Sequence, residues 1–212
     1  MTDDTFNDAF DRYLAATARL GSPVRDVISP LADPRSLDAL RALADVTLPD
    51  ELIAYFCRVD GYDNDALSEL DLFEPNLAWA MTALSVAGVL REHGHLQFAI
   101  IDDAPDYWAD GFLPILSDGA GSVVAVNCIE ESPTFGGVYE MTDSVGLNRI
   151  ASSLTEFFEA GTSVIERGFI RYDDGLLETE HPRFLLEAGP LYGSSPYFAR
   201  IGRMGTQIVD WR

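Results

Sequence analysis

The spacing of apolar residues changes near Gly94, from the period of helices to the short runs of strands. Before Gly94, the pattern predicts helices that cover about residues 4–20, 36–44, 49–59 and 76–93. After it, apolar runs separated by turns predict strands at residues 96–101, 112–116, 122–129 and 137–141. A capping box, Ser153-Leu154-Thr155-Glu156, then predicts a helix over residues 153–167. Nearer the C-terminus we expect a short helix at about 180–187 and a strand at 206–211.

The order of these elements, helices then strands then a helix, predicts an α+β fold rather than alternating βα units. We expect the helices of the first third of the chain and the helix over residues 153–167 to pack on a sheet built from residues 96–141. The link Asp118-Gly119-Ala120-Gly121 is predicted to be a hairpin turn, because glycine adopts positive φ without steric cost. Residues 1–35 are expected to form an N-terminal helical extension, 36–167 the main domain, and 168–212 a C-terminal extension packed on it.

The charge of the chain favours a basic partner. Its 212 residues include 14 Lys and Arg against 35 Asp and Glu, a formal net charge of −21. Such an imbalance repels the phosphate backbone of nucleic acids and attracts basic proteins. We therefore expect no direct binding of nucleic acid. The same charge is equally compatible with a simple contribution to solubility.

Cysteine usage and hydropathy predict a cytoplasmic protein. Cys57 and Cys128 lie in apolar runs, so both are predicted to be buried and reduced. The first ten residues lack the basic region and apolar run of a signal peptide. The sequence also has no apolar stretch of about 18 residues that could cross a membrane, so we expect no membrane partner.

Negative charge is concentrated in two segments. Residues 60–74 contain six acidic residues and no Lys or Arg, and three aspartates follow the first predicted strand. Solubility alone does not require such clustering, so we expect the partner to bind here. The expected contact residues are Asp63, Asp65, Glu69, Asp71, Asp102, Asp103 and Asp106. The alternatives are two solvated loops, or an interface on the C-terminal extension with its aromatic residues Tyr192, Tyr197, Phe198 and Trp211.

The sequence gives little support for catalysis. It has no Gly-x-Ser-x-Gly elbow, and no lysine follows its glycine turn as a phosphate loop requires. Histidines 93 and 95 could ligate a metal, and aspartates 102, 103, 106 and 110 could hold a hard cation or form a catalytic pair, but neither set has the spacing of a known site. We therefore expect no enzymatic activity, no metal and no cofactor. The alternative is a small-molecule or sugar-binding enzyme that uses Asp102, Asp103 or Asp106.

Several short motifs follow one another in the middle of the chain. They are Leu48-Pro49-Asp50-Glu51-Leu52, Tyr55-Phe56, Asp60-Gly61, Trp108, Phe112-Leu113-Pro114-Ile115, Asp118-Gly119-Ala120-Gly121-Ser122, Gly136-Gly137-Val138-Tyr139 and the helical segment 150–158. In this order they resemble the SUKH superfamily, which includes fungal cell-wall-assembly regulators and many bacterial immunity proteins. One departure is Ser122, where the family often has an acidic residue, so any role of that acid is not carried over.

The resemblance implies an α+β fold with a central, mainly antiparallel sheet flanked by helices, no cofactor, and protein–protein contacts. In bacteria the superfamily resembles chiefly immunity proteins that neutralise toxin domains, often nucleases. Nucleases carry basic surfaces, which an acidic protein can occupy with fast, steered association. The sequence thus predicts a non-catalytic protein that neutralises a cognate toxin stoichiometrically, with a cell-wall or regulatory scaffold as a further alternative.

Overall fold

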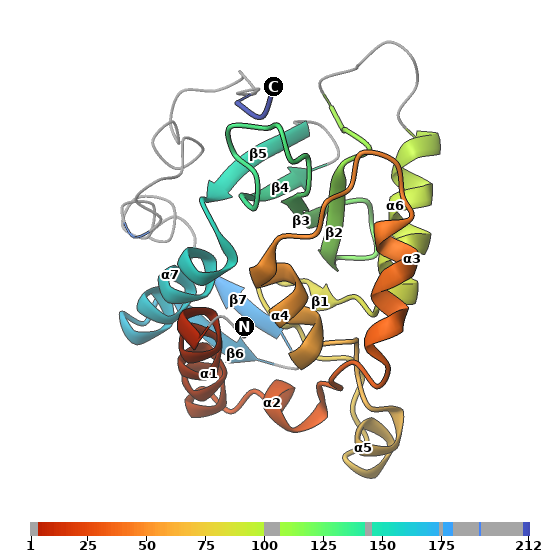
Figure 1. The fold of residues 1–212 in the computed structure, drawn as a ribbon. Helices are drawn as coiled ribbons and strands as arrows, with labels where there is room; N and C mark the ends of the chain where they lie inside the picture. Colours follow the sequence, from red (N-terminus) through yellow and green to blue (C-terminus); the bar gives the residue numbers. More distant parts are fainter. Residues whose placement is uncertain (1–3, 100–106, 143–145, 174–175, 180–190, 192–209) are drawn as a thin grey trace.

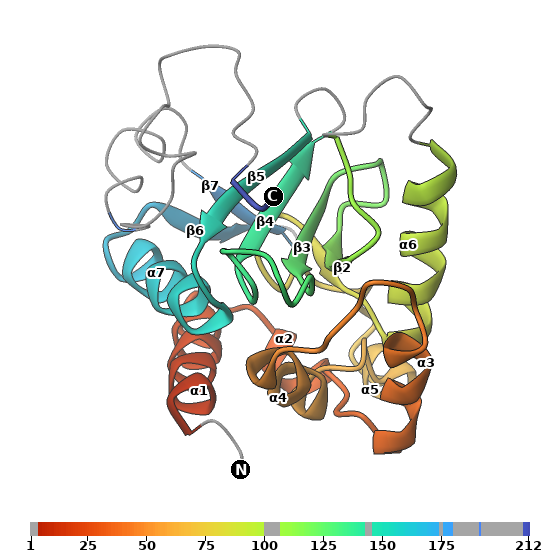
Figure 2. The same ribbon diagram turned by 45° about the horizontal axis from the view of Figure 1, so that its top comes forward.

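A five-stranded antiparallel sheet forms the centre of the fold (Figures 1 and 2). The computed structural model describes residues 4–99, 107–142, 146–173, 176–179, 191 and 210–212. The strands pair in chain order and are β1 (Thr82–Ala83), β2 (Phe112–Ser117), β3 (Val123–Asn127), β4 (Val138–Thr142) and β5 (Gly146–Ala151). A separate antiparallel hairpin is formed by β6 (Ile170–Asp173) and β7 (Leu176–Thr179). The expected α+β fold with an antiparallel sheet is confirmed.

Helices surround this sheet. They are α1 (Asp4–Arg19), α2 (Val24–Val27), a 3₁₀ turn (Pro34–Ser36), α3 (Leu37–Arg41), α4 (Asp50–Arg58), α5 (Asn64–Glu69), α6 (Val86–Ala99) and α7 (Leu154–Glu166). The helices predicted over residues 4–20 and 153–167 are confirmed. Ser153 caps α7 as expected, since its hydroxyl accepts a hydrogen bond from the Glu156 amide at 3.1 Å.

Alternate residues of the strands face two apolar layers. Val124, Val126 and Val138 belong to the layer shared with α1, α4 and α7, whereas Ala125 and Tyr139 belong to the layer on the other face. This period of two is what strands buried on both faces require. The strands predicted at 112–116, 122–129 and 137–141 are confirmed, with ends that differ by one or two residues.

Aromatic side chains fill the layer between α1, α4 and α7. The rings of Phe10 on α1 and Phe158 on α7 meet edge to face, with centroids 4.7 Å apart, and Tyr55 on α4 contacts both. Helices α1 and α7 approach closely at Gly161, where a Cβ atom would lie 2.8 Å from the Tyr13 ring. The N-terminal helix is therefore part of the same core as the sheet.

The last residues of the chain cover the other face of the sheet. Trp211 is buried and stands edge-on to Phe112, with ring centroids 5.4 Å apart. Asp210 accepts hydrogen bonds from the Tyr139 hydroxyl and from Nε of Arg149, both at 2.7 Å. The interpretation of Trp211 as an exposed interface residue is therefore wrong, because its ring completes a core layer.

The long helix predicted over residues 76–93 is wrong in its first half. Asn76 is buried and begins no helix. Trp79 and Ala80 have positive φ angles of 55° and 57°, so the chain reverses between the bridged residues Ala78 and Met81. Helix α6 begins only at Val86, whose amide donates to the Asp60 carboxylate at 2.7 Å. The apolar spacing that suggested a helix comes here from strand β1 and from the buried residues Leu77, Ala78 and Met81 on either side of the turn.

Gly94 does not end α6, which continues to Ala99. A Cβ atom at Gly94 would meet nothing within 4 Å, so the position is open, and a glycine there costs about 1 kcal/mol without breaking the helix. The strand predicted over residues 96–101 is therefore wrong for residues 96–99, which are helical, and residues 100–101 lie outside the described residues. Strand β5 and the β6–β7 hairpin were not predicted.

The hairpin turn between β2 and β3 is confirmed. Gly119 and Gly121 have φ angles of 70° and 113°, and the Asp118 carboxylate accepts hydrogen bonds from the amides of Ala120 and Ser122. Among the described helices, none is long and apolar enough to span a bilayer. The expected short helix at 180–187 and most of the expected strand at 206–211 lie outside the described residues, and the boundaries at residues 35 and 167 stay predictions.

Candidate protein-binding surfaces

The acid-rich segment 60–74, expected to be a loop, contains the short helix α5. Asp63 caps this helix, because its carboxylate accepts hydrogen bonds from the amides of Asp65 at 2.9 Å and Ala66 at 3.2 Å. Leu67 is buried and holds the helix against the body of the protein. Figure 1 shows α5 projecting from the end of the molecule opposite the C-terminus.

Tyr62 fixes the base of this projection. Its hydroxyl donates a hydrogen bond to the Pro75 carbonyl at 2.5 Å and accepts one from the Ala83 amide at 2.9 Å. Burial raises the pKa of this hydroxyl, so it stays protonated and keeps both bonds. The two ends of the segment are thereby tied together, and α5 is presented on a fixed base.

The four expected contact residues of this segment are all exposed. They are Asp63, Asp65, Glu69 and Asp71, and Glu74 is exposed beside them. The ion pairs found among the described residues involve none of these five carboxylates. The structure thus places four of the seven expected contact residues in one exposed segment, where none of them forms an ion pair with a described residue. Asp102, Asp103 and Asp106 lie outside the described residues.

Two apolar side chains accompany these acids. Phe73 is 96% exposed and Leu70 is 51% exposed. Single exposed apolar residues are ordinary, but a phenylalanine with almost no contact to its own protein is not. We call the group Asp63, Asp65, Glu69, Leu70, Asp71, Phe73 and Glu74 the α5 surface. Its apolar members were missed from the sequence, although they interrupt an acidic run in the string Leu70-Asp71-Leu72-Phe73-Glu74.

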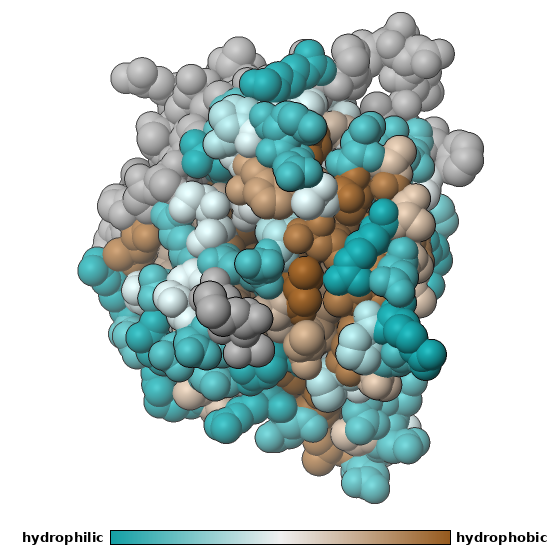
Figure 3. All heavy atoms as spheres, in the orientation of Figure 1, coloured by the Kyte–Doolittle hydropathy of each residue, from teal (hydrophilic) through white to brown (hydrophobic). Residues whose placement is uncertain are grey.

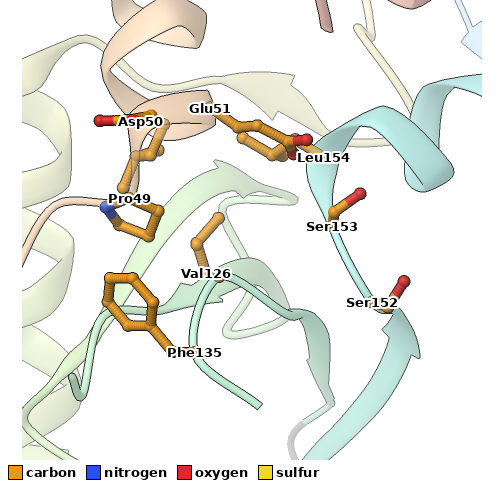
Figure 4. Close-up of a pocket in the computed structure, with 10 residues that line it drawn as sticks. Pro49, Asp50, Glu51, Val126, Phe135, Ser152, Ser153 and Leu154 are labelled. Atoms are coloured by element: carbon orange, nitrogen blue, oxygen red, sulfur yellow. The ribbon is translucent and has the colours of Figure 1, made fainter. Parts of the chain in front are cut away.

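A second candidate site is a small pocket at the N-terminal ends of α4 and α7 (Figure 4). It has a volume of about 180 Å³. Its apolar wall is formed by Pro49, Leu52, Val126, Phe135 and Leu154, and its other lining residues are Asp50, Glu51, Gly136, Ser152 and Ser153. We call it the α4 pocket.

Hydrogen bonds hold the polar side of the α4 pocket. The Glu51 carboxylate accepts from the amide and the hydroxyl of Thr155, at 3.1 and 2.8 Å. The Glu156 carboxylate accepts from the amide and the hydroxyl of Ser152. These carboxylates are therefore engaged in capping α7 and do not form a free pair for acid–base chemistry.

The described residues show no arrangement of metal ligands. No group of three or more His, Cys, Asp or Glu side chains within them could hold a metal ion. His93 is buried and its Nε2 lies 2.7 Å from the Asp110 carbonyl, so this nitrogen donates a hydrogen bond in the core, whereas His95 is exposed. Cys128 is buried as expected, but Cys57 is exposed on the outward face of α4, which corrects the prediction for that residue.

Comparison with known proteins identifies a family. Residues 31–160, more than half of the chain, match the model of the SMI1 / KNR4 family (SUKH-1). The match includes α3 to α6, the whole five-stranded sheet and the first half of α7. A search of curated proteins finds no match.

Proposed function

Because the chain belongs to the SMI1 / KNR4 family (SUKH-1), we propose that it is an immunity protein that binds a basic toxin domain and blocks it without chemical turnover. The family consists generally of non-enzymatic immunity and regulatory domains. The proposal for this chain is carried by the α5 surface, where five exposed carboxylates and a phenylalanine that is 96% exposed lie within twelve residues of chain.

The carboxylates of the α5 surface support fast association with a basic partner. Asp63, Asp65, Glu69, Asp71 and Glu74 are exposed and add to a net charge of −21 for the chain. Charges at the rim of an interface act mainly on the association rate, which steering can raise by a factor of about 10 to 1,000. A partner with a cluster of Lys and Arg, such as a nuclease that holds phosphate, fits this requirement.

Phe73 supports slow dissociation from the same partner. Aromatic side chains near the centre of an interface contribute much of the binding energy when they fill a pocket on the partner. Leu70 extends the apolar contact, and the acids around both side chains provide the polar rim. We therefore propose a contact in which Phe73 is the central residue and the carboxylates surround it.

Co-purification followed by a growth assay tests this function. The full chain is used to capture proteins from the cell that encodes it, and each captured protein is then expressed alone and together with the chain. We expect one captured protein to be basic and to stop growth when alone, and the chain to restore growth. A captured set without any such protein, or hydrolysis by the chain that Asp102→Asn abolishes in a folded variant, contradicts the proposal.

A matched pair of variants connects the rescue to the α5 surface. Phe73→Ser is expected to weaken or abolish the rescue, because it removes the apolar side chain and keeps the charge. Leu176→Ser, at an exposed leucine of the β6–β7 hairpin, controls for the general effect of such a change. Equal loss of rescue in both variants would place the contact outside the α5 surface.

A further inference from the structure

We propose that the α4 pocket receives one apolar side chain of a protein partner, and that Lys or Arg flanks this side chain in the partner's sequence. The proposal goes beyond the α5 surface, since it concerns a different part of the fold. It rests on the proposed function in one respect only, namely that the side chain in the pocket comes from a protein.

The lining of the pocket suits an apolar side chain. Figure 4 shows the rings of Pro49 and Phe135 facing each other, with Val126 beside them. Phe135 is 37% exposed, so its ring forms one wall of the pocket and is not packed in the core. A volume of about 180 Å³ is enough for one side chain of the size of leucine or methionine. Burial of such a side chain is favourable, because it removes apolar surface from water.

The pocket is formed before any partner binds. Glu51 and Thr155 join α4 to α7 by two hydrogen bonds, and Gly136 is fixed by its amide, which donates to the Asn127 carbonyl at 2.8 Å. The amide of Gly137 donates to the Thr134 carbonyl at 2.9 Å, which holds the turn that carries Phe135. A preformed site binds without the entropic cost of ordering its own walls.

Negative charge beside the pocket favours basic residues next to the inserted side chain in the partner's sequence. The Asp50 side chain is exposed and points away from the apolar lining in Figure 4, so its charge faces solvent beside the pocket. The described residues that line the pocket include Asp50 and Glu51 but no Lys or Arg. An acidic flanking residue would be repelled there and a basic one attracted, which is the complementarity that partners show across interfaces.

The surroundings of the pocket also favour a protein as the occupant. Figure 3 shows apolar side chains gathered over α4 and the neighbouring α3 on this face. Leu43, Val46 and Ile53 are partly buried residues of this area that pack on the core and keep some exposed surface. A small molecule would use the pocket alone, whereas a protein can cover the pocket together with this apolar area.

Three short peptides, titrated into the isotope-labelled full chain and followed by NMR, test the proposal. They are acetylated, amidated Lys-Leu-Lys, Lys-Ala-Lys and Glu-Leu-Glu. We expect Lys-Leu-Lys to bind with a Kd of about 10 mM, the strength that burial of one leucine side chain supplies, and to shift the amides of Val126, Gly136 and Leu154. The other two peptides should bind about tenfold more weakly, because each lacks either the apolar occupant or the basic neighbours.

Variants at two exposed phenylalanines give the matched control. Phe135→Ala removes a wall of the pocket and should weaken Lys-Leu-Lys binding about fivefold or more. Phe73→Ala, on the α5 surface, should leave this binding unchanged. Equal binding of Lys-Leu-Lys and Lys-Ala-Lys, shifts confined to other residues, or full binding to the Phe135→Ala variant would each overturn the proposal. The peptides need no toxin, so failure of the growth rescue and failure of this proposal are separate results.

Discussion

Glu51 on α4 and Thr155 at the start of α7 are joined by two hydrogen bonds across 104 residues of chain. The carboxylate accepts from the Thr155 amide at 3.1 Å and from its hydroxyl at 2.8 Å. A glutamate from one helix thus satisfies an amide at the N-terminus of another, where negative charge is also favoured by the helix dipole. The same bonds set the spacing of the two helices at the α4 pocket.

Loss of this contact should destabilise the protein. We expect Glu51→Ala to lower the free energy of unfolding by about 2 kcal/mol, because a helix cap and a charge-assisted hydrogen bond are lost together. Urea denaturation measures the change. Asp50→Ala, next to it on the exposed side of α4, should change stability by less than about 0.5 kcal/mol. Similar losses for both variants would show that the contact with Thr155 contributes little.

The turn between Ala78 and Met81 should be stabilised by glycine. Ala80 has a φ of 57°, a left-handed conformation that is unfavourable for residues with a Cβ atom and is routine for glycine. We expect Ala80→Gly to raise the free energy of unfolding by about 0.5–1 kcal/mol. Ala42→Gly is the control, since Ala42 is also exposed but has a φ of −82°, and it should destabilise. A loss of stability in both variants would show that the positive φ of Ala80 does not destabilise the natural protein.

Glu140 on β4 should make stability depend on pH. Burial raises the pKa of its carboxyl from 4.5 to about 7, and its neighbours across the strands are Val124 and Asn148. The folded protein therefore holds this proton more tightly than the unfolded chain. Its contribution to stability is complete below pH 4.5 and is lost as the pH rises through about 7.

Substitution of Glu140 isolates this effect. Glu140→Gln cannot ionise, so its stability relative to the natural protein should increase between pH 5 and pH 8, by up to about 3 kcal/mol. Denaturation curves for both proteins across this range give the difference. For the exposed Glu131→Gln the difference should stay within about 0.5 kcal/mol at every pH. A difference for Glu140→Gln that does not vary with pH would show that the carboxyl is not desolvated.

The sequence predicted the elements whose apolar pattern and capping agree. Helix α7 has both a capping box and a helical stripe, strands β2 and β3 are almost entirely apolar, and β4 has Val138, Tyr139 and Met141 around a single glutamate, so each was found nearly to its ends. The region from Asn76 to Ala99 was misread because tertiary contacts override the local signals. Its turn at Trp79 and Ala80 uses residues that disfavour positive φ, and Gly94 lies inside a helix.

The candidate surfaces were only partly accessible from sequence. Charge counting found the acids of residues 60–74, because clustering of like charges is visible without a structure. The exposure of Phe73 was not visible, since apolar residues are buried by default and only the fold shows that this side chain points away from the core. The α4 pocket joins residues around 50, 135 and 153, so it depends on a topology that spacing alone does not specify.

Replacement of Asp63, Asp65 and Asp71 by asparagine alters the charge of the α5 surface with little structural change. The Asp63→Asn substitution would keep the helix cap, since asparagine caps as well as aspartate does. Asp71 has a φ of 52°, a conformation that asparagine also tolerates. Asp65 is exposed on α5. The triple variant therefore tests charge and not folding.

The association rate of the triple variant with the toxin domain identified by growth rescue tests the central claim most directly. Stopped-flow measurements at low ionic strength should give a rate about tenfold lower than that of the natural chain, because rim charges steer the encounter. The two rates should converge at about 1 M salt, because the Debye length falls to about 3 Å there and the charges no longer steer the partner. An association rate at low ionic strength that is the same for both proteins would contradict binding through the α5 surface.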